Sequence, residues 1–281
     1  MNNDFVKKIK VKFRKGKTII KNKLVDYAKG YSMSAIVLFH LIFYYLNVSD
    51  IIRLGSSFGG AGVHIFLICS GFGLYYSQLK HPLVFKKFII KRFKRIYIPY
   101  VFIIIISFLV PFMYSGKNRV LALLSHVLLF KMFVPSFEGS FGVQMWFIST
   151  IIQFYLIFLP VCHLKERMEN NQFIILSILL SLIWATIITT LNKVDNRVWN
   201  SFFVQYFWEF SIGMCLGEYF KNKQHEYFTR FHYLTLIIVF GISFCIYAIM
   251  ALKYVEWRAF NDAFGVTAFG SLMLILYKLG F

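Results

Sequence analysis

The chain has 281 residues, 58% of them hydrophobic and 34 of them phenylalanine, and its mean hydropathy is +0.64. This composition is far more apolar than a soluble core requires, so it excludes an ordinary soluble enzyme and indicates a membrane protein. The formal net charge is +19, but 17 of the 31 Lys and Arg residues border apolar runs, ten in residues 7–29 and seven in residues 80–95. This distribution is typical of cytoplasmic membrane borders, and we expect the lipid bilayer, not nucleic acid, as the partner.

Apolar runs of membrane-spanning length recur along the whole chain. An α-helix of about 20 apolar residues crosses a hydrocarbon core of roughly 30 Å, and an isolated strand cannot pair its backbone groups there. We therefore predict an all-α polytopic membrane helix bundle with no soluble domain. The nine expected spans cover residues 30–48, 59–79, 96–115, 119–136, 142–163, 172–191, 200–220, 233–252 and 259–280. The fourth of them is expected either to span the membrane or to re-enter it.

Two regions are predicted. Residues 1–25 form a basic N-terminal arm, expected in the cytoplasm or against anionic lipid, and residues 26–281 form the membrane-embedded domain. The positive-inside rule places the N-terminus in the cytoplasm and the loop around Asp50 and Arg53 outside. The first span is expected to be retained, because it does not follow the short n-region of a signal peptide.

The first span places a histidine near the middle of the membrane. His40 lies ten residues into that span, about 15 Å from its start. Ionisable groups at this depth are functional candidates, because a charge there costs a few kcal/mol. The alternative is a neutral histidine hydrogen-bonded to a neighbouring helix, and position alone leaves both open.

The second span contains small residues and two polar groups. The sequence GGAG at residues 59–62 permits close helix approach, which is also the ordinary use of small residues in membrane helices. His64 is expected to face the bundle, and Ser70 places a hydroxyl beside a flexible backbone point.

Two arginines precede the third span. Arg92 and Arg95 are three residues apart, so on a helix they share a face. Their planar guanidinium groups suit phosphate or carboxylate oxygens. The alternative is that the whole basic run only marks the cytoplasmic border.

Polar residues further along the chain give weaker signals. Glu209 lies inside an apolar run and is expected to pair with a basic residue, to be protonated, or to contact hydroxyl groups of a ligand. His126, Lys131 and Glu138 are expected to line a loop near the side of the membrane where that ligand binds. Four cysteines have no C-x-x-C spacing and are expected to be small buried hydrophobes: Cys69, Cys162, Cys215 and Cys245.

Four segments follow one another as in membrane-bound acyltransferase family 3. They are DYAKGYSMSAIVLFH at 26–40, GVHIFLICSGF at 62–72, KRFKRIYIPY at 91–100 and MWFISTIIQFYLIFLP at 145–160. Each segment is loose alone, but four in order are specific, and the chain resembles the family from about residue 24 to its end. The resemblance implies a ten-helix protein that moves an acyl group, usually acetyl from cytoplasmic acetyl-CoA, to a hydroxyl of a cell-surface glycan or glycolipid.

The resemblance also implies roles for individual residues. His40 matches the family's essential first-helix histidine, and Arg92 and Arg95 match the arginine pair thought to contact the acyl donor. Asp26 and Lys29 match a D-x-x-[RK] element, which adds Lys29 to the donor-binding candidates. Ser70 of the second-helix SGF element joins His40 as a catalytic candidate. The supporting candidates are Asp26 before the first span, Gly71 and Phe72 of the second helix, Trp146 and Tyr155 of the fifth-helix motif, and Glu209.

The chain departs from the family pattern in two places. Many members have glutamates five and six positions after the tryptophan of the fifth-helix motif, where this chain has Ile151 and Ile152. No role for those acids is therefore transferred. The chain also ends at LYKLGF, where the family usually continues into a tenth helix, so we expect a truncated or naturally shortened form.

The implied chemistry needs few groups. A hydroxyl that attacks a thioester needs a base of near-neutral pKa, and His40 is expected to take its proton or, in a covalent alternative, to carry the acyl group itself. Ser70 is expected to assist as an oxyanion or orienting donor, or only to pack. Arg92 and Arg95 are expected to hold the donor's phosphates at the cytoplasmic mouth. We expect no permanently bound cofactor and no metal, with acetyl-CoA or another acyl-CoA as co-substrate.

The sequence thus predicts an O-acyltransferase, in particular an O-acetyltransferase, acting on cell-surface or exported polysaccharide in a bacterial cytoplasmic membrane. The bacterial source is inferred from the Lys, Ile, Asn and Phe richness typical of A+T-rich genomes. The missing glutamate pair favours a capsular polysaccharide or exopolysaccharide acceptor. Two alternatives stay open, namely a non-enzymatic carrier for a glycan, lipid or ion, and an inactive family remnant.

Overall fold

The computed structural model describes residues 3–110, 118–222 and 232–280. All secondary-structure elements assigned in these ranges are α-helices or 3₁₀ helices. The all-α prediction is therefore confirmed for the described chain. The α-helices are α1 (Asn3–Tyr45), α2 (Asp50–Ser57), α3 (Gly62–Lys80), α4 (Phe85–Leu109), α5 (Arg119–Val127), α6 (Trp146–Glu166), α7 (Asn170–Thr190), α8 (Arg197–Asn200), α9 (Phe207–Asn222), α10 (Tyr233–Leu252) and α11 (Asp262–Leu279). The 3₁₀ turns are η1 (Phe58–Ala61), η3 (Lys131–Phe133), η4 (Pro135–Phe137), η5 (Val143–Met145), η6 (Phe203–Tyr206) and η8 (Val255–Phe260).

Five helical segments of the described chain are long and apolar enough to cross a membrane, by length and composition. They are Asp50–Lys80, which joins α2, η1 and α3, and the helices α6, α7, α10 and α11. Each buries only part of its surface inside the protein. A helix with an apolar outer surface is stable in lipid, because its backbone groups are paired within the helix. The chain is therefore a multi-pass membrane protein.

The expected fourth span differs from the structure. Residues 119–136 form α5, of nine residues, and then the turns η3 and η4. At 1.5 Å per residue α5 is about 13 Å long, too short to cross the membrane, so the prediction of a spanning helix here is wrong, while the re-entrant alternative stays a prediction. Two buried polar side chains explain why the helix is short. His126 and Lys131 take their hydrogen-bond partners from neighbouring loops and α4.

Other boundaries also moved. α1 runs without a break from Asn3 through the basic arm, whose side chains at residues 3–22 lie outside the described part. The expected seventh span starts later, since residues 197–206 form α8 and η6 before α9 begins. The end of the expected third span, residues 111–115, lies outside the described residues.

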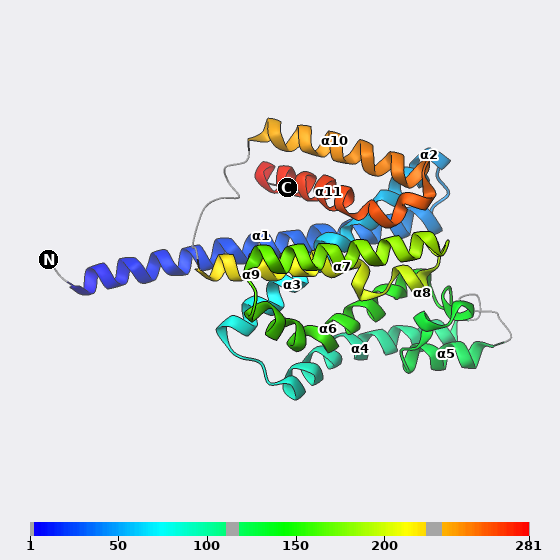
Figure 1. The fold of residues 1–281 in the computed structure, drawn as a ribbon, viewed down its shortest axis with the longest axis horizontal. Coiled ribbons are helices and arrows are strands. Elements are labelled where there is room, and N and C mark those ends of the chain that lie inside the picture. The colour runs from blue at the N-terminus through cyan, green and yellow to red at the C-terminus, as the bar shows by residue number, and fades with distance from the viewer. Residues whose placement is uncertain (1–2, 111–117, 223–231, 281) are drawn as a thin grey trace. The chain divides into compact units, whose positions relative to one another are not determined.

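The chain divides into two compact units, which are described separately. Unit 1 comprises residues 1–76, 212–254 and 261–281, and unit 2 comprises residues 77–211 and 255–260. In unit 1, α10 and α11 run side by side (Figure 1) and pack with α1, η1 and α3 around one apolar cluster. The buried members of this cluster are Ala28, Ala61, Ile65, Cys69, Tyr247, Ala268, Phe269 and Met273.

Glycines bring the helices of unit 1 into backbone contact. A Cβ on Gly62 would lie 2.7 Å from the Ser32 carbonyl oxygen of α1, so the start of α3 touches α1 where no side chain intervenes. Gly217 of α9 meets the Phe72 carbonyl oxygen of α3 in the same way, at 2.9 Å, and Gly213 lies against the Ile68 carbonyl oxygen one turn earlier. Small residues four apart are a common device for close packing of membrane helices.

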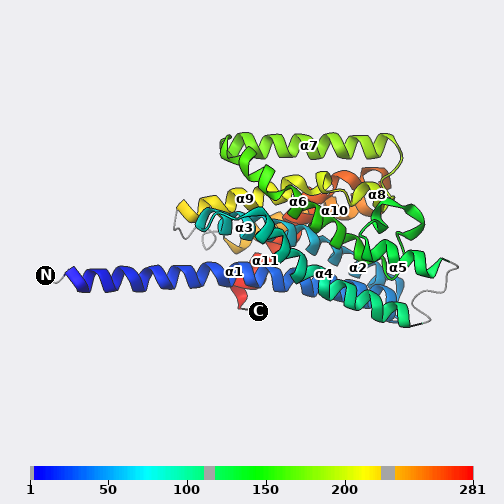
Figure 2. The ribbon, with the colours of Figure 1, turned by 90° about the horizontal axis from the view of Figure 1, so that it is seen from below.

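In unit 2, α6 lies between α4 and α7 (Figure 2). Hydroxyl and amide side chains of α6 and α7 hold the α8–η6 loop against these helices. Thr150 Oγ1 donates to the Ser201 carbonyl oxygen at 2.6 Å, and Gln153 Oε1 accepts from the Phe203 backbone N–H at 3.1 Å. Ser181 Oγ donates to the Val204 carbonyl oxygen at 2.7 Å. These bonds satisfy loop backbone groups that have no helical partner.

We predict that Gly213→Ala destabilises the protein while Gly241→Ala does not. The new methyl group at 213 collides with α3 backbone, whereas a Cβ at Gly241 of α10 meets nothing within 4 Å. Overpacking of this kind costs about 1–3 kcal/mol. Thermal unfolding midpoints of the two detergent-solubilised variants give the comparison. Equal midpoints would contradict the close approach of α3 and α9.

Candidate functional site

His40 lies near the C-terminal end of α1 in unit 1, and its side chain is half-buried. Its Nδ1 is 2.8 Å from the Ile36 carbonyl oxygen. A carbonyl oxygen only accepts hydrogen bonds, so Nδ1 carries the hydrogen, and in the neutral ring the lone pair lies on Nε2. The ring stacks on Tyr44, with centroids 6.0 Å apart, and contacts Phe39 at 4.5 Å. The backbone and two aromatic rings thus orient an imidazole whose Nε2 is the basic nitrogen.

The glycine-rich turn fixes the part of α1 that carries His40. A Cβ at Gly59 would lie 2.6 Å from the Ala35 carbonyl oxygen and 3.0 Å from the Phe39 Cβ. Phe39, the residue before His40, therefore rests on the backbone of η1. The expectation that residues 59–62 permit close helix approach is confirmed at Gly59 and Gly62.

Ser70 of α3 lies at a different height along the α1 axis from His40. Its hydroxyl donates to the Phe66 carbonyl oxygen at 2.8 Å, so its proton is already used within α3. The charges of Lys29 and Asp26 act on the neighbouring Cys69 thiol, and Cys69 shares the apolar cluster with Ala28. The structure thus brings Asp26, Lys29 and Ser70 to one level, while His40 lies eleven residues after Lys29, about 16 Å further along α1.

The rest of the second-helix element packs against α9. Gly71 is buried, and the Phe72 ring contacts Phe220 at 5.9 Å and stacks on Tyr76 at 5.8 Å. This placement supports a packing role for the Ser70–Phe72 element.

Arg92 and Arg95 lie in the basic first part of α4, in unit 2. Arg92 is half-buried, with its guanidinium carbon 5.9 Å from the centre of the Phe88 ring, and Arg95 is exposed. Burial lowers the pKa of Arg92, the Tyr155 phenol opposes that shift, and the positive charge of Arg95 adds to it. Two cations close together and partly withdrawn from water gain from an anionic ligand, and guanidinium groups bind phosphate oxygens in pairs.

The fifth-helix motif supports these arginines. The charges of Arg92 and Arg95 both act on the Tyr155 phenol of α6, whose ring packs on Phe88 with centroids 6.0 Å apart. Trp146, at the start of α6, packs under the Arg197 guanidinium at 5.0 Å and against Tyr206 at 5.8 Å. Trp146 thus packs against the loop that follows α7, and Tyr155 lies beside the two arginines.

Three further groups were singled out in the sequence. Glu209 is fully buried at the start of α9. His64 faces the interior as expected, with Nε2 3.6 Å from a carboxylate oxygen of Asp262. Asp262 was missed, although an acidic residue in the first turn of the last apolar run is a recognisable signal. Cys69, Cys162 and Cys215 are buried as expected, but Cys245 is exposed on α10, because that helix presents most of its apolar surface outward.

A family model for the acyltransferase domain, family 3, matches residues 22–281. The chain belongs to acyltransferase family 3. No curated protein and no solved structure matches it. In this family-3 acyltransferase the candidate residues form two sets. His40, Asp26, Lys29 and Ser70 belong to unit 1, and Arg92, Arg95, Trp146 and Tyr155 belong to unit 2.

Proposed function

We propose that this family-3 member is an O-acyltransferase that moves an acyl group, in particular acetyl, from cytoplasmic acyl-CoA to a hydroxyl of a cell-surface or exported polysaccharide. The observation that carries the proposal is the hydrogen bond from His40 Nδ1 to the Ile36 carbonyl oxygen, which leaves Nε2 as the base. Family membership supports acyl transfer as the reaction class. The proposal adds the donor, the acceptor and the residue roles.

The reaction needs one proton carrier. The acceptor hydroxyl gives its proton to His40 Nε2 as its oxygen bonds to the thioester carbonyl carbon. The C–S bond then breaks, and the departing CoA thiolate takes the proton from the imidazolium, which restores the neutral ring. In the covalent alternative, Nε2 first bonds to the carbonyl carbon as the C–S bond breaks and the CoA thiolate leaves. The acceptor hydroxyl oxygen then bonds to that carbon, the N–C bond breaks, and the hydroxyl proton passes to the thiolate. Both routes use the same nitrogen.

The arginine pair is the proposed donor site. CoA carries phosphates, and Arg92 and Arg95 offer two neighbouring guanidinium groups, one of them half-buried. Lys29 lies in unit 1 and is half-buried at the level of Ser70. We propose it as a second cation on the donor side, since it lies near the same cytoplasmic border as the N-terminal basic run.

The orientation follows from the distribution of charge. The basic residues in the first part of α1 and in the first part of α4 favour a cytoplasmic location for those ends. The α2 segment and the segment after α4 then lie toward the outside. We propose a bacterial cytoplasmic membrane as the location. Exported or surface polysaccharide fits as the acceptor because its hydroxyls are presented on that outer side.

We predict that His40→Ala abolishes O-acetylation of surface glycans. Loss of a general base costs about 10²- to 10⁴-fold in rate. The measurement is mass spectrometry of surface glycans from cells that make each variant at equal membrane levels. His81→Ala is the matched control, because His81 is exposed in the loop after α3. Unchanged acetylation with His40→Ala would overturn the assignment.

The donor site generates a second prediction. Arg92→Gln raises the KM for acetyl-CoA about 10-fold or more, because a charge-assisted hydrogen bond contributes about 1.5–3 kcal/mol. Lys91→Gln removes the same charge from an exposed neighbouring position and leaves the KM within about twofold. Steady-state kinetics of both variants give the comparison. Equal effects of the two substitutions would mean that the basic run acts only as a topology signal.

A further inference from the structure

A buried polar cluster follows α4 in unit 2, and the proposed function does not use it. Lys131 is 2% exposed and His126 is fully buried, although both lie among short helices. Lys131 Nζ donates to the carbonyl oxygens of Ser140 at 3.0 Å and Gly142 at 2.9 Å. These two bonds close the chain between residues 131 and 142 around an ammonium group.

The hydrogen-bond directions in this cluster can be worked out. His126 Nε2 lies 3.0 Å from the Ser140 carbonyl oxygen, so Nε2 carries a hydrogen. Burial, and then the Lys131 charge, lower the pKa of His126 to about 3, so the ring is neutral. Its Nδ1 therefore accepts from the Tyr100 hydroxyl, 2.7 Å away. The Tyr100 hydroxyl hydrogen is thus used on His126, so Tyr100 donates no hydrogen bond to an anion in this region.

The Lys131 charge is poorly compensated. Burial lowers the pKa of Lys131 to about 8, with Glu138 opposing the shift, so the ammonium form predominates at pH 7. Two of its three hydrogens go to neutral carbonyls, and none of the ion pairs in the described chain includes it. A buried cation with only neutral hydrogen-bond partners is costly, and an anion beside it repays part of that cost.

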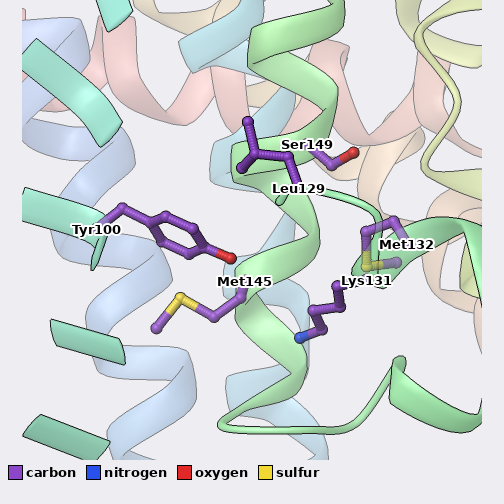
Figure 3. A pocket seen from close by; sticks show the side chains of 6 residues that line it. All are labelled: Tyr100, Leu129, Lys131, Met132, Met145 and Ser149. Atoms are coloured by element: carbon purple, nitrogen blue, oxygen red, sulfur yellow. The ribbon is translucent and has the colours of Figure 1, made fainter. Parts of the chain in front are cut away.

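A small pocket opens beside this ammonium (Figure 3). It is lined by Tyr100, Leu129, Lys131, Met132, Met145 and Ser149 and has room for about one water molecule. Leu129, Met145 and Ser149 are half-buried, so the pocket reaches the surface of unit 2. Ser149 Oγ accepts a long bond from Gln153 Nε2, at 3.4 Å, which leaves its own hydrogen to donate. The lining thus offers a cationic donor and a hydroxyl donor, and no carboxylate.

We propose that this pocket binds one oxygen of an anionic group, a carboxylate or a phosphate, on the acceptor, and that the acceptor is therefore an acidic glycan. The inference rests on the proposed function for the word acceptor, but the pocket is formed by unit 2 alone. Tyr100 lies eight residues after Arg92, about 12 Å along α4 and away from the basic end. The pocket is then on the non-cytoplasmic side of the donor arginines, where a glycan approaches.

The test measures glycan binding to the full chain in nanodiscs of neutral lipid, with no acyl-CoA present. The probes are a hyaluronan hexasaccharide, a glycerol phosphate hexamer and the neutral hexamer of N-acetylglucosamine. We expect at least one acidic probe to bind about 10-fold or more tightly than the neutral one, because charge-assisted hydrogen bonds carry the preference. Which acidic probe binds identifies the group as carboxylate or phosphate.

Matched variants separate the pocket from the general positive charge of the chain. Lys131→Met removes the preference, whereas Lys193→Met, at an exposed position of the same unit, keeps it. Ser149→Ala leaves intact the hydrogen bonds from Lys131 to the backbone and weakens the binding of acidic probes about threefold or more. This variant tests the pocket even if Lys131→Met does not fold. Equal binding of acidic and neutral probes by the wild type, or an unchanged preference in Ser149→Ala, overturns the proposal. The two proposals can fail separately. If the wild type prefers acidic probes but His40→Ala leaves acetylation unchanged, the anion pocket is retained and the proposed role of His40 in acyl transfer is rejected.

Discussion

A polar group at membrane depth has to find its hydrogen-bond partner inside the protein, because lipid offers none. That constraint explains the local geometry of both units. The His40 imidazole turns its Nδ1 back to the Ile36 carbonyl oxygen, and Ser70 does the same toward Phe66. One consequence separates the two residues. A histidine has a second nitrogen left for chemistry after its first is bonded, whereas the serine has used its only proton.

The same constraint shapes the segment between α4 and α6. Its buried histidine and lysine cannot sit on a lipid-facing helix, so the chain folds back on α4, where Tyr97 donates to the Val127 carbonyl oxygen at 2.6 Å and Tyr100 donates to His126. The Lys131 ammonium then donates hydrogen bonds to two loop carbonyl oxygens, those of Ser140 and Gly142. A helix long enough to span would have left both side chains in hydrocarbon. The short helices are therefore explained by His126 and Lys131. The hydrogen bonds of these two residues also position Tyr100 and Lys131, which line the proposed anion pocket.

Sequence patterns predicted the all-α fold, the family and the close approach at the 59–62 turn, because run length, motif order and small residues are local properties. They did not decide whether residues 119–136 span, because mean hydropathy does not register how two polar side chains find partners distant in the chain. The catalytic role of Ser70 beside His40 stays a prediction, and the charges of Lys29 and Asp26 act on Cys69, the residue before Ser70. The patterns placed Lys131 in a loop near the acceptor side but did not indicate its pocket, because Tyr100 and Ser149, which also line it, come from α4 and α6.

The central claim is that His40 Nε2 couples the loss of the CoA thioester to the formation of an oxygen ester. Its most direct test incubates membrane vesicles containing the purified chain with labelled acetyl-CoA and glycan from the same cells, and counts released CoA thiol against new O-acetyl ester. We predict one thiol per ester with the wild type and neither above background with His40→Ala. Glycan movement across the membrane without thiol release would contradict the claim and indicate a carrier.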